Sequence, residues 1–186
     1  MHKRIHIKRA AYLITTNCKG RFPFFEEDIL CNILIDAIES CRKMKSFELI
    51  AFKINPDHSH VLLQPTGKFN ISQILQNIKR TSSNHINQII HFFQAENQYK
   101  KLNWTESLQQ YNLMFIRKYN FRGIHEFPKF QWQEGFDDQL VRTQEELEIK
   151  INYIKKQALK HELKEDKFLF VTETIPSDIV FIGQRK

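Results

Sequence analysis

Residues 56–64 run Pro56-Asp57-His58-Ser59-His60-Val61-Leu62-Leu63-Gln64, and the predicted fold is arranged around them. Side chains alternate between the two faces of a β-strand, so His58 and His60 are expected to project from the same face. Two imidazoles fixed side by side on a strand are suited to binding a metal ion, and an open face leaves room for a substrate oxygen. The alternative is two half-exposed histidines at a strand start, because pairs with this spacing are common by chance.

The composition is that of a globular protein with one hydrophobic core. The chain has 186 residues, of which 41% are hydrophobic and 26% are charged. No apolar run approaches the roughly 18–20 residues that span a bilayer, so we expect no membrane partner. The basic N-terminus lacks the apolar core of a signal peptide, and the three cysteines lack C-x-x-C spacing. These features favour reduced thiols and a cytoplasmic, nucleoid-associated location in a bacterial-type cell.

The charge balance favours a polyanionic partner. There are 28 Lys and Arg residues against 21 Asp and Glu residues, which gives a formal net charge of +7. Nucleic acid is the leading candidate. The basic residues expected to contact it are Lys3, Arg4, Lys8, Arg9, Lys79, Arg80, Arg117, Lys118 and Arg122.

Hydrophobic periodicity and turn signals give the expected elements. Strands are predicted at residues 11–17, 47–54 and 58–64, with a fourth starting at 130–133 and resuming toward 140–141. Helices are predicted at residues 26–43, from Asn70 with a capping box to Gln73, and from Thr143 with a capping box to Glu146. Residues 94–128 form an insertion or arm, within which 104–119 are predicted to be helical.

This order of elements matches an α+β, ferredoxin-like split βαβ fold, with a four-stranded antiparallel sheet and two helices on one face. The histidine strand would be central, and the C-terminal helix could lie across the open face. We expect one domain over residues 1–165 and a tail at 166–186 that packs on it.

Tyr153 is the candidate functional residue on that last helix. At 100° per residue it lies to one side of the apolar stripe, and Gln157 one turn later shares its flank. The alternative is an amphipathic tyrosine at the edge of the core, as most tyrosines are. The stripe consists of Leu147, Ile151, Ile154 and Ala158.

Three segments together resemble the single-tyrosine HUH transposases, and among them the REP-associated tyrosine transposases, relatives of the insertion-sequence transposases that act on single-stranded DNA. They are the histidine run at 54–63, the Trp-Gln segment at 130–136 and the helix at 147–163. The chain departs from the family at Asp57, where Asn is usual, and at Ser59, where a hydrophobic residue is usual. Gln157-Ala158 replaces Asn-Pro and is expected to continue the helix.

The resemblance implies a mechanism. Tyr153 would attack a phosphodiester of single-stranded or hairpin DNA and form a 5′-phosphotyrosine link. His58, His60 and Gln157 would hold a divalent ion, Mg²⁺ or Mn²⁺, and this would be a weak Mg²⁺ site because imidazole suits Mn²⁺ better. No general base is evident, and a homodimer is left open.

Two other functions are weighed against this one. A DNA-binding module that no longer cuts is motivated by Ser59 and by the altered segment after the tyrosine. A relaxase or replication initiator would share the histidine pair, but in relaxases the tyrosine usually precedes the histidines, which argues against that class.

Overall fold

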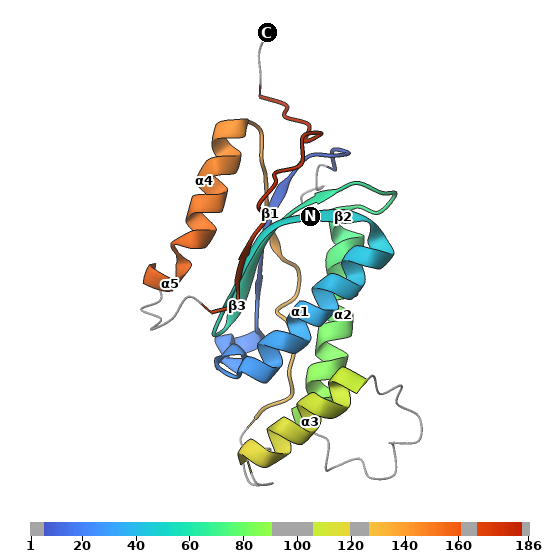
Figure 1. Ribbon diagram of the computed structural model, residues 1–186, viewed down its shortest axis with the longest axis vertical. Helices are drawn as coiled ribbons and strands as arrows, with labels where there is room; N and C mark the ends of the chain where they lie inside the picture. The colour runs from blue at the N-terminus through green and yellow to red at the C-terminus, as the bar shows by residue number, and fades with distance from the viewer. Residues whose placement is uncertain (1–5, 91–105, 120–126, 161–166, 184–186) are drawn as a thin grey trace.

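The computed structural model describes residues 6–90, 106–119, 127–160 and 167–183 (Figure 1). Its centre is one antiparallel sheet with the strand order β4-β1-β3-β2-β5. The strands are β1 (Tyr12–Asn17), β2 (Phe47–Asn55), β3 (His58–Pro65), β4 (Asp137–Leu140) and β5 (Leu169–Val171). The predicted α+β class with an antiparallel sheet is confirmed. The sheet has five strands where four were predicted, because Leu169–Val171 pairs with the outer edge of β2.

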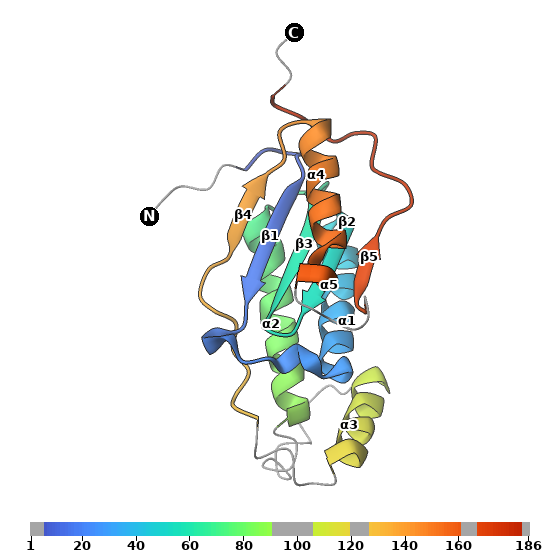
Figure 2. The same ribbon diagram turned by 90° about the vertical axis from the view of Figure 1, so that its left-hand side faces the viewer.

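Helices cover both faces of the sheet. On one face lie α1 (Asp28–Lys45) and α2 (Ile71–Ile90), and α3 (Glu106–Tyr119) contacts both of them. On the other face lies α4 (Gln144–Lys155), followed by the short α5 (Gln157–Lys160), as the two side views show (Figures 1 and 2). Two 3₁₀ turns, η1 (Lys19–Arg21) and η2 (Phe24–Glu26), connect β1 to α1. Within the described residues, no helix is long and apolar enough to cross a bilayer.

The alternation of side chains along the strands divides the core into two parts. On β3, Val61 and Leu63 pack toward α1 and α2, whereas Leu62 packs toward α4. The smaller part is closed by three residues of α4: Leu147, Ile151 and Ile154. This contact fixes α4 across the histidine face of the sheet.

A β-bulge in β2 decides which of its residues face α4. The register with β3 shifts between Leu49 and Ala51, so Ile50 is an extra residue. Ile50 and Ala51 therefore both join the α4 side of the core, and Phe52 returns to the α1 and α2 side. Beyond the bulge, Lys53 is paired with His60 and Asn55 with His58, so both residues lie on the histidine face.

Both predicted helix caps are present. Asn70 Oδ1 accepts a hydrogen bond from the Gln73 amide at 3.0 Å, and Gln73 Oε1 accepts from the Asn70 amide at 3.1 Å. At α4, Thr143 Oγ1 accepts from the Glu146 amide at 3.0 Å. The Glu146 carboxylate accepts from the amide of Arg142 at 2.8 Å, one residue before the expected partner.

Other expectations need correction. Residues 130–133 contribute only an isolated bridge between Trp132 and Cys18, because the side chain of Asn87 binds both backbone polar groups of Phe130. The predicted helix at 104–119 buries Leu108 and Phe115 and leaves Leu113 exposed. In the tail, residues 179–182 form no strand, but Ile179 and Phe181 pack in the smaller part of the core.

The last helix is also interrupted, where it was predicted to continue through Gln157. Lys156 adopts a turn conformation at the end of α4, and α5 starts at Gln157. The two side chains on either side of this turn differ in exposure. Gln157 is buried, whereas Tyr153, one turn earlier, is 37% exposed.

Candidate active site

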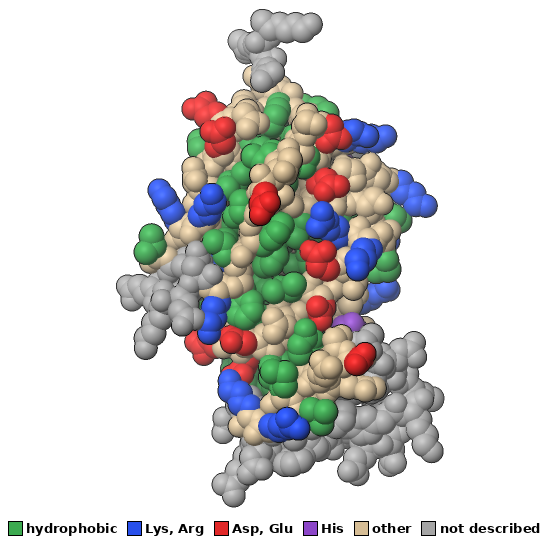
Figure 3. All heavy atoms as spheres, in the orientation of Figure 1, with side chains coloured by type: hydrophobic (Ala, Val, Ile, Leu, Met, Phe, Trp, Pro, Cys, Tyr) green, Lys and Arg blue, Asp and Glu red, His purple; other side chains and the backbone are tan. Residues whose placement is uncertain are grey.

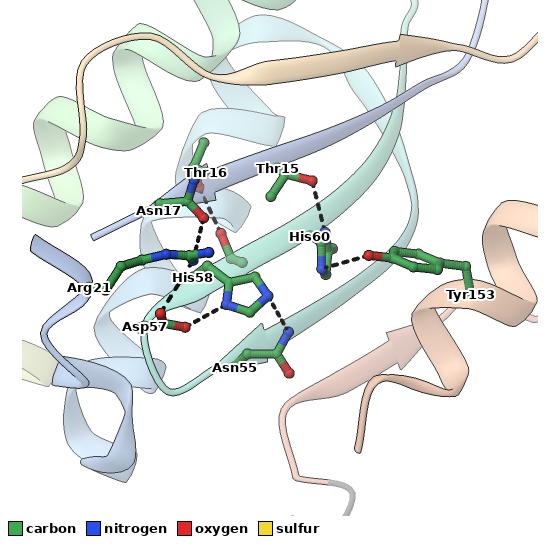
Figure 4. A network of polar contacts seen from close by, with 10 residues as sticks. Thr15, Thr16, Asn17, Arg21, Asn55, Asp57, His58, His60 and Tyr153 are labelled. Atoms are coloured by element: carbon green, nitrogen blue, oxygen red, sulfur yellow. Dashed lines mark hydrogen bonds and ion pairs between the residues drawn. The ribbon is translucent and has the colours of Figure 1, made fainter. Parts of the chain in front are cut away.

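The candidate site is built on the first residues of the central strand β3. His58 and His60 project from the same face, with ring centroids 4.9 Å apart and ring planes at 86° (Figure 4). Each histidine has cross-strand neighbours on that face. His58 lies between Asn17 and Asn55, and His60 lies between Thr15 and Lys53.

Asp57 and Asn55 hold the ring of His58 from opposite ends. Asp57 Oδ1 lies 2.6 Å from His58 Nδ1, and Asp57 Oδ2 forms an ion pair with Arg21 at 3.2 Å. A carboxylate paired with a guanidinium accepts hydrogen bonds, so Nδ1 is the donating nitrogen. The lone pair is then on Nε2, where Asn55 Nδ2 donates to it at 3.0 Å. Arg21 is itself fixed by Asn17 Oδ1 at 2.7 Å.

The ring of His60 is also held by a side chain at its Nδ1 atom. Its Nδ1 lies 2.9 Å from Thr15 Oγ1, and its Nε2 faces the Tyr153 hydroxyl at 3.5 Å, the long end of the range for a hydrogen bond. The rings of His60 and Tyr153 are 5.2 Å apart and nearly perpendicular. The Nδ1 atoms of both histidines are therefore engaged by side chains of the chain itself, and Tyr153 approaches the Nε2 atom of His60.

Tyr153 reaches this position because α4 is anchored by its apolar stripe. Leu147, Ile151 and Ile154 are buried against the sheet, which turns the flank of α4 bearing Tyr153 toward the open end of β3. Tyr153 as a whole residue is 37% exposed, so its side chain is not enclosed by the protein.

Gln157 is buried where α5 lies against β2, with 1% of its surface exposed. Its Nε2 donates to the Tyr153 carbonyl oxygen at 3.1 Å, and its Oε1 has no hydrogen-bond partner. Asn55 Oδ1 is a second buried oxygen without a partner. A buried polar atom normally finds a partner, and an amide oxygen is an acceptable ligand of a divalent ion. Of these two oxygens, that of Asn55 belongs to a side chain in contact with His58, whereas the side chain of Gln157 contacts the backbone of Tyr153.

The donor atoms of these residues determine which divalent metal ion would fit the site. No group of three or more His, Cys, Asp and Glu side chains that could hold a metal occurs in the described part of the chain. The available donors are therefore imidazole nitrogens and amide oxygens. Such a set suits Mn²⁺ and, when completed by phosphate oxygens, Mg²⁺.

Ser59 is accommodated between the two histidines. It points to the opposite face, is buried, and forms a hydrogen bond with Thr16 across β1 and β3 at 2.9 Å. The polar residue at this usually hydrophobic position is thus paired, and the strand that carries the histidines is intact.

Five residues around the site were not predicted from the sequence: Thr15, Arg21, Lys53, Asn55 and, as a partner of His58, Asp57. Lys53 is fully buried, and its ammonium group donates to the carbonyl oxygen of Lys167 just before β5. The signal for Thr15, Lys53 and Asn55 is their cross-strand position beside the histidines, and for Lys53 and Asn55 that position depends on the bulge at Ile50. The signal for Asp57 is its place next to His58 in the sequence.

The basic residues predicted to bind DNA are not gathered at Tyr153. Lys79, Arg80, Arg117 and Lys118 belong to α2 and α3, on the far side of the sheet from α4 (Figure 2). Lys79 donates to two carbonyl oxygens, of Gln133 and Gly135, and Lys118 pairs with Glu27 at 2.6 Å.

The other predicted DNA contacts are distributed differently. Arg9 pairs with Asp178, whereas Lys8, Arg80 and Arg117 are exposed. Lys3, Arg4 and Arg122 lie outside the described residues. Acidic and basic side chains are interspersed on the face shown in Figure 3.

A basic and aromatic pocket of about 280 Å³ lies at the opposite end of β3 from the histidines. We call it the Phe69 pocket, and its lining includes Lys8, Tyr12, Lys68, Phe69 and Asn70. Lys45 Nζ lies 3.7 Å and Lys68 Nζ 5.4 Å from the centroid of the Phe69 ring. Cations beside an aromatic face are suited to a nucleic acid, since they can contact phosphates while the ring contacts a base.

Comparisons with known proteins concern the family and the fold of the chain. The model of the family described as "Transposase IS200 like" matches residues 6–119. Among solved structures, the chain is similar to a REP-associated tyrosine transposase bound to a REP hairpin, with 17% identity and a TM-score of 0.56 over 87% of this chain and 73% of that one. It is also similar to a candidate transposase from Deinococcus radiodurans R1, with 15% identity and a TM-score of 0.46 over 84% of this chain and 97% of that one. No curated protein matches the chain.

Proposed function

The chain belongs to the IS200-like transposase family, and we propose that it cleaves and rejoins single-stranded DNA beside hairpins, with Tyr153 as the nucleophile. The observation that carries the proposal is the approach of the Tyr153 hydroxyl, from a separate helix, to Nε2 of His60 at 3.5 Å beside the second ring of the histidine pair. The solved relative with the same fold is bound to a REP hairpin, which supports a hairpin as the partner here.

The reaction is a transesterification at phosphorus. The Tyr153 oxygen forms a bond to the phosphorus atom and loses its proton, while the bond from phosphorus to the DNA 3′-oxygen breaks. The departing 3′-oxygen takes up a proton, and the 5′-phosphate stays on the tyrosine. The number of phosphoester bonds is unchanged, so the strand can be rejoined by the reverse reaction without an external energy source.

The residues around Tyr153 have separate tasks in this proposal. Thr15 and Asp57 hold the two imidazoles by their Nδ1 atoms, so that the Nε2 atoms keep their lone pairs. A divalent ion, Mg²⁺ or Mn²⁺, held by His58, His60 and Gln157 would polarise the scissile phosphate. The anchored stripe of α4 positions the tyrosine, and its partial exposure admits the DNA strand.

The test uses a labelled hairpin oligonucleotide with a single-stranded flank, incubated with the protein and Mn²⁺ or Mg²⁺. We expect nicking and a protein–DNA adduct that survives denaturing electrophoresis, and we expect Tyr153→Phe to abolish both while hairpin binding persists. The ring remains, so the free energy of unfolding should change by less than about 1 kcal/mol.

Tyr111→Phe is the matched control. Burial, together with a hydrogen bond and the nearby charge of Asp36, raises the pKa of Tyr111 to about 12, and this tyrosine lies on α3 across the sheet. This control should cleave like the wild type. Adduct formation by Tyr153→Phe would place the nucleophile elsewhere. Hairpin binding by the wild type without cleavage in either metal would identify a non-catalytic binding module instead.

A further inference from the structure

Asn55 lies beside His58 with one end of its side-chain amide paired and the other unpaired. Its side chain lies on the histidine face, with 1% of the residue exposed, and Nδ2 is 3.0 Å from His58 Nε2 (Figure 4). Its Oδ1 points away from the ring and has no partner. A buried amide that satisfies only one of its two ends leaves a costly unpaired acceptor.

The spacing between these two side chains also fits a shared ion. Two donor atoms bound at right angles to one ion, each at about 2.1 Å, lie about 3.0 Å apart. The two ends of an amide have almost the same size, so a half-turn about the Cβ–Cγ bond brings Oδ1 to the position of Nδ2. The imidazole lone pair and the amide oxygen would then both face the same point.

We infer that Asn55 is an additional oxygen ligand of the divalent ion, beside His58. This inference rests on the proposed function, because the ion belongs to the same site. An extra oxygen ligand shifts an imidazole site toward the hard ions Mg²⁺ and Mn²⁺, which prefer carbonyl and carboxylate oxygens. The position of Asn55 on the histidine face is a result of the bulge at Ile50.

The alternative role for Asn55 is to donate a hydrogen bond to His58 and so hold its ring. Asn55→Asp separates the two roles, because a carboxylate has the same shape but no N–H group. If Asn55 is a ligand, the added negative charge tightens binding of the ion. If Asn55 only donates to Nε2, the carboxylate favours a proton on that nitrogen and weakens binding.

The experiment measures Mn²⁺ affinity by titration calorimetry and by electron paramagnetic resonance on the full chain, with the hairpin oligonucleotide present. We expect Asn55→Asp to bind Mn²⁺ at least about tenfold more tightly and Asn55→Leu to bind it about tenfold or more weakly. Mn²⁺ should also raise the Tm of Asn55→Asp more than that of the wild type, because the buried carboxylate is neutralised by the ion.

Asn17 supplies the matched control. It is the neighbour of His58 on the other side, in β1, but its Oδ1 already accepts a hydrogen bond from Arg21. Asn17→Asp adds the same charge beside the same histidine, and we expect Mn²⁺ affinity to stay within about twofold of the wild type. Equal tightening in both Asp variants would show a general effect of charge and overturn the inference.

His58→Ala distinguishes the failure of this inference from the failure of the proposed site. If His58→Ala loses Mn²⁺ while Asn55→Asp binds it more weakly than the wild type, the metal site stands and Asn55 is not a ligand. If His58→Ala binds Mn²⁺ like the wild type, the proposed metal site is wrong and the inference about Asn55 fails with it.

Discussion

The roles of the two histidines depend on the side chains that contact and orient them. His58 and His60 could be recognised from their spacing, but the groups that orient them could not. Asp57 is adjacent in sequence to His58. Thr15 and Arg21 come from about 40 residues earlier, and they contact His60 and Asp57, respectively, only in the folded chain. A pattern in one segment does not reveal partners of this kind.

The thiols of the three cysteines are expected to be unreactive in the native protein. All are buried and free, and burial raises the pKa of Cys18 to about 12 and that of Cys41 to about 11. At pH 8 only about one Cys18 in ten thousand would be a thiolate. Native protein should therefore react slowly with iodoacetamide, and all three thiols should react in urea. Mass spectrometry counts the labels, and rapid labelling of the native chain would contradict the burial.

His85 gives the stability a dependence on pH. Burial lowers its pKa, and the nearby charge of Asp36 opposes this shift only in part. The folded pKa is then below the unfolded value of about 6.5, so the contribution of neutral His85 is complete above that pH and is lost as the pH falls through the folded pKa.

Urea unfolding between pH 7.5 and pH 5 measures this effect. We expect the free energy of unfolding to decrease toward pH 5 in the wild type and to decrease less in His85→Gln. His6→Gln, at an exposed position, controls for the loss of an imidazole. Identical slopes for the wild type and His85→Gln would show that His85 does not cause the loss.

At the scale of elements, α4 is the part that brings the nucleophile candidate to the sheet. Its start is fixed by the Thr143 cap, and Tyr153 lies in its last turn. Thr143→Ala removes the acceptor for the Glu146 amide and should lower the free energy of unfolding by about 1 kcal/mol in urea denaturation. Thr143→Ser keeps the hydroxyl and should stay close to the wild type. An unchanged Thr143→Ala would mean that the cap contributes nothing to stability.

Features that depend only on residues close together in the sequence were predicted correctly. The Asn70 box and the periodic faces of α1 and α2 depend on neighbouring residues, and the structure confirms them. The strand at 130–133 was wrong because Asn87, more than 40 residues away, binds the backbone of Phe130. The turn at Lys156 was also missed, since no Pro or Gly marks it and burial of Gln157 accompanies it.

At the scale of the whole molecule, the candidate active site and the Phe69 pocket lie at opposite ends of β3. His60 and Pro65 are five residues apart on the strand, which corresponds to about 17 Å. A DNA strand that reached both would follow the length of the sheet. We expect the net charge of +7 to provide a general attraction for DNA, and we propose that the Phe69 pocket provides a defined contact.

DNA affinity should therefore depend steeply on salt, and part of that dependence should come from the Phe69 pocket. On single strands each phosphate contact contributes about 0.7 to the slope of log affinity against log salt concentration. Lys68→Gln should reduce the slope by about this amount.

Lys129→Gln is the control for this measurement. Lys129 is exposed. The next residue, Phe130, binds Asn87 in the C-terminal half of α2, whereas Phe69 precedes the start of that helix. Lys129 and the Phe69 pocket therefore lie toward opposite ends of α2. The slope of Lys129→Gln should equal that of the wild type. Fluorescence anisotropy with the hairpin oligonucleotide gives both slopes, and equal reductions in the two variants would indicate diffuse attraction rather than a defined contact.

The bulge at Ile50 makes the chemistry of the histidine face a matter of residue count as well as residue type. Because Ile50 is the extra residue, loss of its codon would restore regular alternation and leave Lys53 and Asn55 on the histidine face. If all the residues of β2 were kept and the bulge were straightened, Lys53 and Asn55 would instead turn toward the apolar core, and Phe52 and Ile54 would lie beside the histidines. When relatives are aligned, a strand that is one residue shorter should therefore be given its gap at Ile50, so that the residues facing the histidines are compared with one another.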